Sequence, residues 1–108
     1  MTVKELSVYL SADVLSLPDP EREVKGVYIG DLLSWVMGRA KEADTWITIM
    51  SNINVVAVAS LSDTACVILA EGVRLDTQVI NTAEKKGVNI LSSDKSAYEI
   101  AVALQSVI

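Results

Sequence analysis

The sequence contains no histidine, a single cysteine and no phenylalanine among its 108 residues. Without histidine the chain lacks the usual general base, which excludes Ser-His-Asp and Cys-His catalytic sites. One cysteine and no histidine also exclude the standard zinc sites. No G-x-x-x-x-G-K-[ST] segment is present, and no G-x-G-x-x-G follows a predicted strand, so the usual phosphate-binding loops are missing. We therefore expect a protein that is not an enzyme and needs neither cofactor nor metal.

Basic residues are also scarce, with nine Lys and Arg against fourteen Asp and Glu and a net charge of -5. Lys85-Lys86 is the only adjacent basic pair. Nucleic-acid binding needs a clustered basic surface, and anionic membranes attract one. The first residues lack the basic start and the long apolar run of a signal peptide. No apolar run reaches the ~18 residues that a membrane span needs. We expect a cytoplasmic protein without a nucleic-acid or membrane partner.

The lone cysteine, Cys66, lies inside the apolar run 65–69. A single cysteine cannot form an internal disulfide, and a reactive thiol needs a basic or helix-start environment that lowers its pKa. Neither feature surrounds Cys66 in the sequence. We expect a buried core thiol.

Apolar residues are abundant instead, at 51% of the chain with a mean hydropathy of +0.39. The length fits one domain, 1–108, and a domain of this size has much surface for little interior. Part of the apolar excess therefore fits a subunit interface, most simply that of a twofold homodimer. Trp35, Met37 and Trp46 are the candidate interface residues, since large apolar side chains anchor such contacts.

Turn signals and apolar periodicity divide the sequence into alternating strands and helices. Residues 17–21 contain two prolines and form the clearest loop. Residues 3–10 fit a helix or a strand, and residues 55–61 fit a buried strand or a buried helix; we favour a helix for both. The other predicted strands are 13–16, 24–29, 45–50, 65–69 and 88–91, and the other predicted helices are 32–39, 77–86 and 97–107.

Capping signals support these helices. Asp31, Asn54 and Asp76 stand where N-caps are expected, Ser96-Ala97-Tyr98-Glu99 matches a capping box, and Gly87 is a C-terminal stop. In the second half of the chain, the connections between successive strands are about 15 to 20 residues long, enough for parallel, right-handed crossovers. The predicted fold class is therefore α/β: a single small domain with a mostly parallel sheet flanked by helices.

A polar segment interrupts two apolar runs at Ser51-Asn52-Ile53-Asn54. Short polar side chains here can cap the following helix, or they can surround a helix N-terminus that binds an anion. The sequence leaves both interpretations open. Glu71-Gly72 follows the next buried strand, where open α/β sheets place their ligands. The candidate ligand-binding residues are Ser51, Asn52, Asn54, Glu71 and Gly72, with no catalytic residue among them.

Several segments together carry a family resemblance. They are GVYIGDLLSWVMGRA at 26–40, WITI at 46–49, NVVAVASL at 54–61, AEG at 70–72 and GVNILSSDKSAYEIAVAL at 87–104. The chain resembles the small stand-alone bacterial proteins of the DRTGG-domain family. The resemblance implies a small α/β module, often dimeric, similar to the non-catalytic N-terminal domain of HPr kinase. Related modules occur between the adenine-nucleotide-sensing CBS domains of some pyrophosphatases.

The sequence departs from the signature that names this family. Ser51-Asn52 stands where the family often has Asp-Arg, and Ala70-Glu71-Gly72 stands where it has Thr-Gly-Gly, so only Gly72 matches. Because both segments follow strands of the predicted parallel sheet, we expect them to form one patch.

These observations lead to two functional hypotheses. The first is a non-catalytic regulatory or interaction module that works as a homodimer and has an unidentified protein partner. The alternative is a small-molecule sensor that binds an adenine nucleotide or another anion near residues 51–54 and 70–72.

Overall fold

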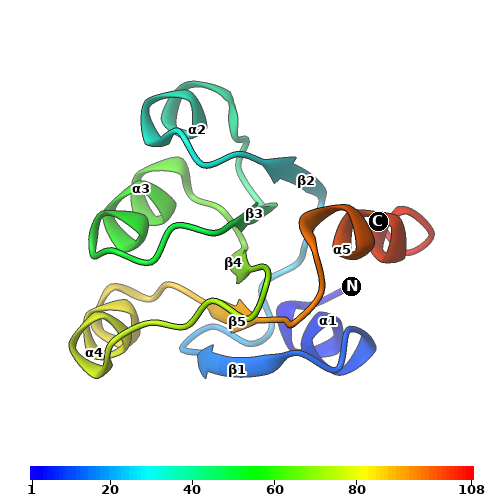
Figure 1. Ribbon diagram of the computed structural model, residues 1–108, viewed down its shortest axis with the longest axis horizontal. Helices are drawn as coiled ribbons and strands as arrows, with labels where there is room; N and C mark the ends of the chain where they lie inside the picture. Colours follow the sequence, from blue (N-terminus) through cyan, green and yellow to red (C-terminus); the bar gives the residue numbers. More distant parts are fainter.

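The computed structural model describes residues 1–108 as a five-stranded β-sheet with helices packed on both faces (Figure 1). The strand order is β1-β5-β4-β3-β2, in which β5, β4, β3 and β2 are parallel and β1 pairs antiparallel with β5. The strands are β1 (Asp13–Ser16), β2 (Gly26–Ile29), β3 (Asp44–Thr48), β4 (Cys66–Leu69) and β5 (Ile90–Ser92). The helices are α1 (Val3–Tyr9), α2 (Leu33–Arg39), α3 (Asn54–Ser62), α4 (Thr77–Lys86) and α5 (Ala97–Gln105).

The helices form an outer layer on each side of the sheet. Figure 1 shows α2, α3 and α4 along one face, and α1 and α5 on the other. Every residue of β3, β4 and β5 is buried, as expected for parallel strands that are covered on both faces. The predicted fold class is confirmed.

Alternation along the buried strands divides the core into two clusters. Val67 and Leu69 of β4 point to the α2–α4 side, where they join a cluster of 13 buried residues. Cys66 and Ile68 point to the α1/α5 side and join a cluster of 12. Each fully buried aliphatic side chain of this kind stabilises the fold by about 1.5–3 kcal/mol. The two clusters fix the sheet between its helical layers.

Capping boxes set the beginnings of α1 and α5. Thr2 Oγ1 accepts from the Glu5 amide, and the Glu5 carboxylate accepts from the Thr2 amide. Ser96 and Glu99 form the same pair at α5, which confirms the capping box predicted there. The choice of a helix for residues 3–10 is also confirmed, and its N-terminal capping box was missed in the sequence.

The helix chosen for residues 55–61 is confirmed as α3, but two strands begin two residues later than predicted. Strand 24–29 starts at Gly26 because the Val24 amide bonds to the Met1 carbonyl, outside the sheet. Strand 88–91 starts at Ile90 because the Val88 amide still closes α4 on the Ala83 carbonyl. Backbone pairing, rather than apolar character, sets these boundaries.

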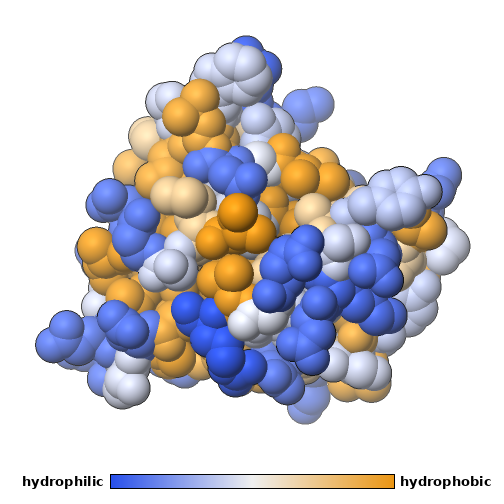
Figure 2. Space-filling model, in the orientation of Figure 1, coloured by the Kyte–Doolittle hydropathy of each residue, from blue (hydrophilic) through white to orange (hydrophobic).

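Exposed apolar side chains remain on the surface of this fold. Figure 2 shows hydrophobic residues over the middle and the left of the molecule, and mainly hydrophilic residues on its right. None of the five helices is long and apolar enough to cross a membrane.

Candidate functional site

The loops that follow the parallel strands lie along one edge of the sheet, here called the carboxyl edge. Thr48, the last residue of β3, pairs with Leu69, the last residue of β4. The loops after these two strands are therefore neighbours, and the Ala70 amide bonds to the Thr48 carbonyl at 3.0 Å. Both segments proposed as a ligand site, 51–54 and 70–72, come to this edge. The structure brings the two segments to one edge; their binding role stays a prediction.

The polar segment before α3 is a turn with a cap. Asn52 Oδ1 accepts from the Asn54 amide at 2.9 Å, and the Asn52 carbonyl accepts from the Val55 amide at 3.1 Å. The Val56 amide bonds to the Ile53 carbonyl at 3.1 Å. The predicted cap by Asn54 is wrong, because α3 begins at Asn54 and Asn52 supplies the acceptor two residues earlier. The first amides of α3 already have partners, which favours capping over anion binding.

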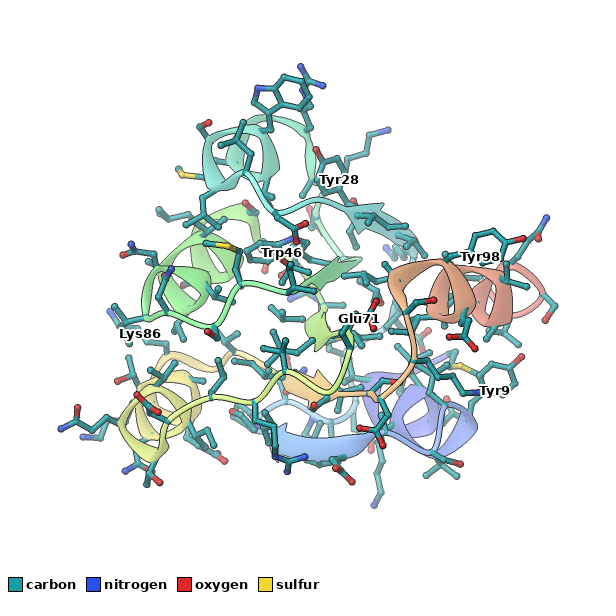
Figure 3. All side chains as sticks on the ribbon, in the orientation of Figure 1. Tyr9, Tyr28, Trp46, Glu71, Lys86 and Tyr98 are labelled. Atoms are coloured by element: carbon teal, nitrogen blue, oxygen red, sulfur yellow. The ribbon has the colours of Figure 1, made fainter.

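Glu71 and Gly72 form a turn in the left-handed region, with φ of 59° and 74°. Their amides donate to the carbonyls of Lys95 at 2.9 Å and Ser93 at 2.8 Å, so the turn is joined to the loop after β5. A Cβ on Gly72 would lie 3.2 Å from Asp94 Oδ1. Glycine is therefore required here by backbone conformation and close approach. The Glu71 side chain is exposed, and Figure 3 shows it beside β4, near the middle of the view.

Asp31 also has a different role from the predicted one. It does not cap α2, whose N-cap position is held by Leu32 without a side-chain hydrogen bond. Asp31 Oδ1 instead accepts from Thr48 Oγ1 at 2.8 Å and from the Ile49 amide at 3.0 Å. These bonds join the β2–α2 turn to the end of β3 and end the strand at Thr48. Its position directly after a parallel strand was the available signal.

The carboxyl edge combines carboxylates with exposed apolar side chains. Asp31, Glu71 and Asp94 come from the loops after β2, β4 and β5, and Arg74 and Lys95 are the basic residues in these loops. Arg74 is paired with Asp13 on β1 at 2.8 Å. The exposed apolar residues of this edge are Ile29, Leu32, Ile49 and Ile53. An apolar or basic group fits such a surface better than a polyphosphate does.

The candidate interface residues divide into two groups. Trp46 lies in β3, an interior strand of the sheet, with no exposed surface, and its indole N–H donates to the Gly30 carbonyl at 2.8 Å. The prediction of Trp46 as an interface residue is therefore wrong, because helices cover both faces of that strand. Trp35 and Met37 are half exposed on α2. The Arg39 guanidinium lies 3.7 Å from the centroid of the Trp35 ring, a cation–π contact.

Cys66 is the one residue with a strongly shifted pKa. Burial in the sheet raises the pKa of its thiol to about 12, although a hydrogen bond with Thr45 acts in the opposite direction. The thiol is therefore protonated and enclosed, as a core residue should be. No group of three or more His, Cys, Asp or Glu side chains lies close enough together to hold a metal ion.

Three hollows indent the surface, and the candidate ligand residues line none of them. The first, of about 620 Å³, lies beside α1 and is lined by Thr2, Lys4, Glu5, Val8, Tyr9 and Glu21. The other two, of about 350 and 520 Å³, lie against α3 and α4 and share Ile53 and Thr82. The carboxyl edge around Glu71 and Gly72 is therefore a surface rather than a pocket.

Comparisons with known proteins agree on one family and one fold. The model of the DRTGG domain matches residues 5–107. A crystal structure of the CBS and DRTGG domains from the regulatory region of Clostridium perfringens pyrophosphatase, complexed with its activator diadenosine tetraphosphate, superposes with a TM-score of 0.75 at 14% identity. The superposition covers 97% of this chain and 46% of that one, so the chain spans less than half of that structure. No curated protein sequence matches the chain.

Proposed function

Because the chain belongs to the DRTGG-domain family, we propose that it is a non-catalytic regulatory and interaction module that acts as a homodimer. The observation that carries this proposal is the exposed apolar surface. Leu32 and Trp35 near α2 and Ile53 and Leu61 near α3 are each about half exposed or more. Scattered apolar residues are ordinary on a protein surface, but a set on adjacent helices is typical of an interaction site.

The chemistry of the side chains supports a module without a catalytic step. The Cys66 thiol is enclosed in the core with a pKa raised to about 12, so it offers no nucleophile. Asp31 at the carboxyl edge is engaged by two hydrogen-bond donors of the next strand. The related fold of the clostridial pyrophosphatase belongs to a regulatory region, which is consistent with the same role here.

Sedimentation equilibrium of the purified chain tests the homodimer. We expect a mass twice the 11.6 kDa of one chain at concentrations of about 1 to 100 μM. Dilution across that range gives the dissociation constant. A mass of one chain throughout the range would overturn the homodimer.

A sensor of adenine nucleotides is the second candidate. It is favoured by the adjacency of the segments 51–54 and 70–72 at the edge where open α/β sheets bind ligands. The clostridial regulatory region in complex with diadenosine tetraphosphate gives a related fold with such a ligand. The exposed Ile49 and Ile53 offer apolar contact to a base, whereas Glu71 and Asp94 repel phosphates. We infer that a ligand here contacts the edge mainly through its base.

A thermal-shift series with adenosine, AMP, ATP, diadenosine tetraphosphate and inorganic phosphate tests the sensor. A ligand at a hundred times its dissociation constant adds about 2.7 kcal/mol to the free energy of unfolding, a rise of several degrees in melting temperature. Glu71→Lys should increase the shift caused by phosphorylated ligands. Glu21→Lys makes the same charge change in the loop after β1, away from this edge, and should leave the shift unchanged. No shift in the wild type or in either variant would contradict the sensor.

A further inference from the structure

The outer face of α3 carries no charge and exposes apolar side chains to solvent. Ile53, Ala57 and Leu61, spaced four residues apart, are exposed along it, and we call this set the α3 stripe. Leu61 is 72% exposed and Ile53 is 47% exposed. The sequence has no charged residue between Asp44 and Asp63. The other exposed residues of α3, Asn54 and Ser60, are polar but uncharged, so the uncovered side of this helix offers no charge to a partner.

The α3 stripe borders a hollow that can accept side chains from a partner. Together with Thr82 and Lys86 of α4 it lines a depression of about 350 Å³. A second depression continues from Ile53 along α4 towards Lys85. Figure 3 shows Lys86 beside these two helices, on the left of the molecule. The surface is therefore apolar along α3 and mainly polar along α4, where it includes Lys85 and Lys86.

We propose that the α3 stripe packs antiparallel against the α3 stripe of a second copy of this chain. The inference rests on the homodimer proposed above and assigns its interface. Ile53 and Leu61 each stand four residues from Ala57, so the stripe is symmetric about Ala57. A twofold axis perpendicular to α3 at Ala57 places each Ile53 against Leu61 of the other copy. Alanine at the crossing point lets the two helices approach closely.

The charges of α4 fit the same twofold arrangement. Asp76 precedes the first turn of α4, and Lys85 and Lys86 outnumber Glu84 in its last turn. None of these four residues belongs to an ion pair within the chain. With α3 antiparallel to its copy, α4 is antiparallel as well, and its acidic end faces the basic end of the other α4. Such exposed pairs contribute more to orientation than to affinity, so the apolar stripe supplies the contact and the charges fix its direction.

An acidic protein partner would match Lys85 and Lys86 but would face Asp76 with a like charge. A second copy satisfies both ends of α4 at once, and its own stripe carries no charge to be buried. A symmetric stripe also gains from symmetry, because each contact is made twice across the axis. The observations therefore favour self-association at this surface.

Disulfide cross-linking tests the register, in a Cys66→Ala background. Ala57→Cys lies on the axis and should form a covalent dimer with a mild copper oxidant. Ile53→Cys and Leu61→Cys should cross-link efficiently only when the two variants are mixed, since antiparallel packing separates identical residues. Val8→Cys, on the exposed outer side of α1, is the matched control and should form no covalent dimer under the same conditions.

Ala57→Glu tests the same surface without a cross-linking reaction. Position 57 is exposed in the single chain, so the variant should fold, while two carboxylates would meet on the axis of the dimer. We expect the dissociation constant to rise at least tenfold, whereas Val8→Glu should leave it unchanged. A wild-type chain that is monomeric would overturn the homodimer itself. A wild-type dimer that survives Ala57→Glu, or that cross-links no better through Ala57→Cys than through Val8→Cys, would overturn only the α3 interface.

Discussion

Replacing Asp31 by alanine tests how the carboxyl edge is held together. Asp31 Oδ1 accepts from Thr48 Oγ1 at 2.8 Å and from the Ile49 amide at 3.0 Å. Thr48 is buried, so its hydroxyl would lose its acceptor in a place that water reaches poorly. A hydrogen bond to a charged group contributes about 1.5–3 kcal/mol, and Asp31 itself is exposed, so we expect the low end of this range. The free energy of unfolding should therefore fall by about 1.5 kcal/mol.

Urea denaturation followed by tryptophan fluorescence measures this change. Trp46 is a suitable probe because its indole donates to the carbonyl of Gly30, the residue before Asp31. With a urea m-value of about 1–3 kcal/mol/M, the midpoint should fall by roughly 1 M. Asp31→Asn is the matched control, because its amide oxygen can still accept from both donors. Its free energy of unfolding should therefore fall clearly less than that of Asp31→Ala.

A double-mutant cycle with Thr48→Val decides whether the two side chains act together. If the hydrogen bond between them stabilises the fold, the double variant should lose less free energy of unfolding than the two single variants lose together. The difference should be about 1 kcal/mol. Strict additivity would refute the reasoning, as would a midpoint for Asp31→Ala equal to that of the wild type. Either result would mean that the strand ladder alone holds this edge.

Three further outcomes are expected. Iodoacetamide at pH 8 should alkylate Cys66 only after unfolding, because burial raises its pKa to about 12; equal rates in native and unfolded protein would contradict the enclosed thiol. Gly72→Ala should destabilise the fold by about 1–2 kcal/mol, since alanine is strained at a φ of 74° and its Cβ would approach Asp94; an unchanged urea midpoint would argue against this. Backbone and side-chain hydrogen bonds of the capping boxes lower the pKa of Glu5 and Glu99, so their stabilisation is present above the unfolded-state pKa and is lost as the pH falls through the folded-state pKa. The melting temperature should therefore fall less steeply between about pH 5 and pH 3 in Glu5→Gln/Glu99→Gln than in the wild type, and equal slopes would exclude the effect.

The carboxyl edge shows how far sequence reasoning reaches. Parallel pairing follows from the alternation of strands and helices, so the position of 51–54 and 70–72 at one edge of the sheet could be expected in advance. The hydrogen-bond partners of individual polar groups could not be expected in this way. Asn52 rather than Asn54 supplies the cap, and Asp31 bonds across to the end of β3 instead of capping α2. These choices depend on which donor lies nearest once the strands are aligned.

The sequence by itself determined the fold class, the sites of most helices and the identity of Cys66 as a core thiol. Runs of apolar residues, capping boxes and turn residues act locally, so their effect can be predicted without the rest of the chain. Only the tertiary structure decided which apolar side chains are left outside. Trp46 is enclosed because β3 is an interior strand with helices on both faces, whereas Leu61 is exposed because α3 lies in the outer layer. Burial is a property of the assembled layers, and residue type alone does not determine it.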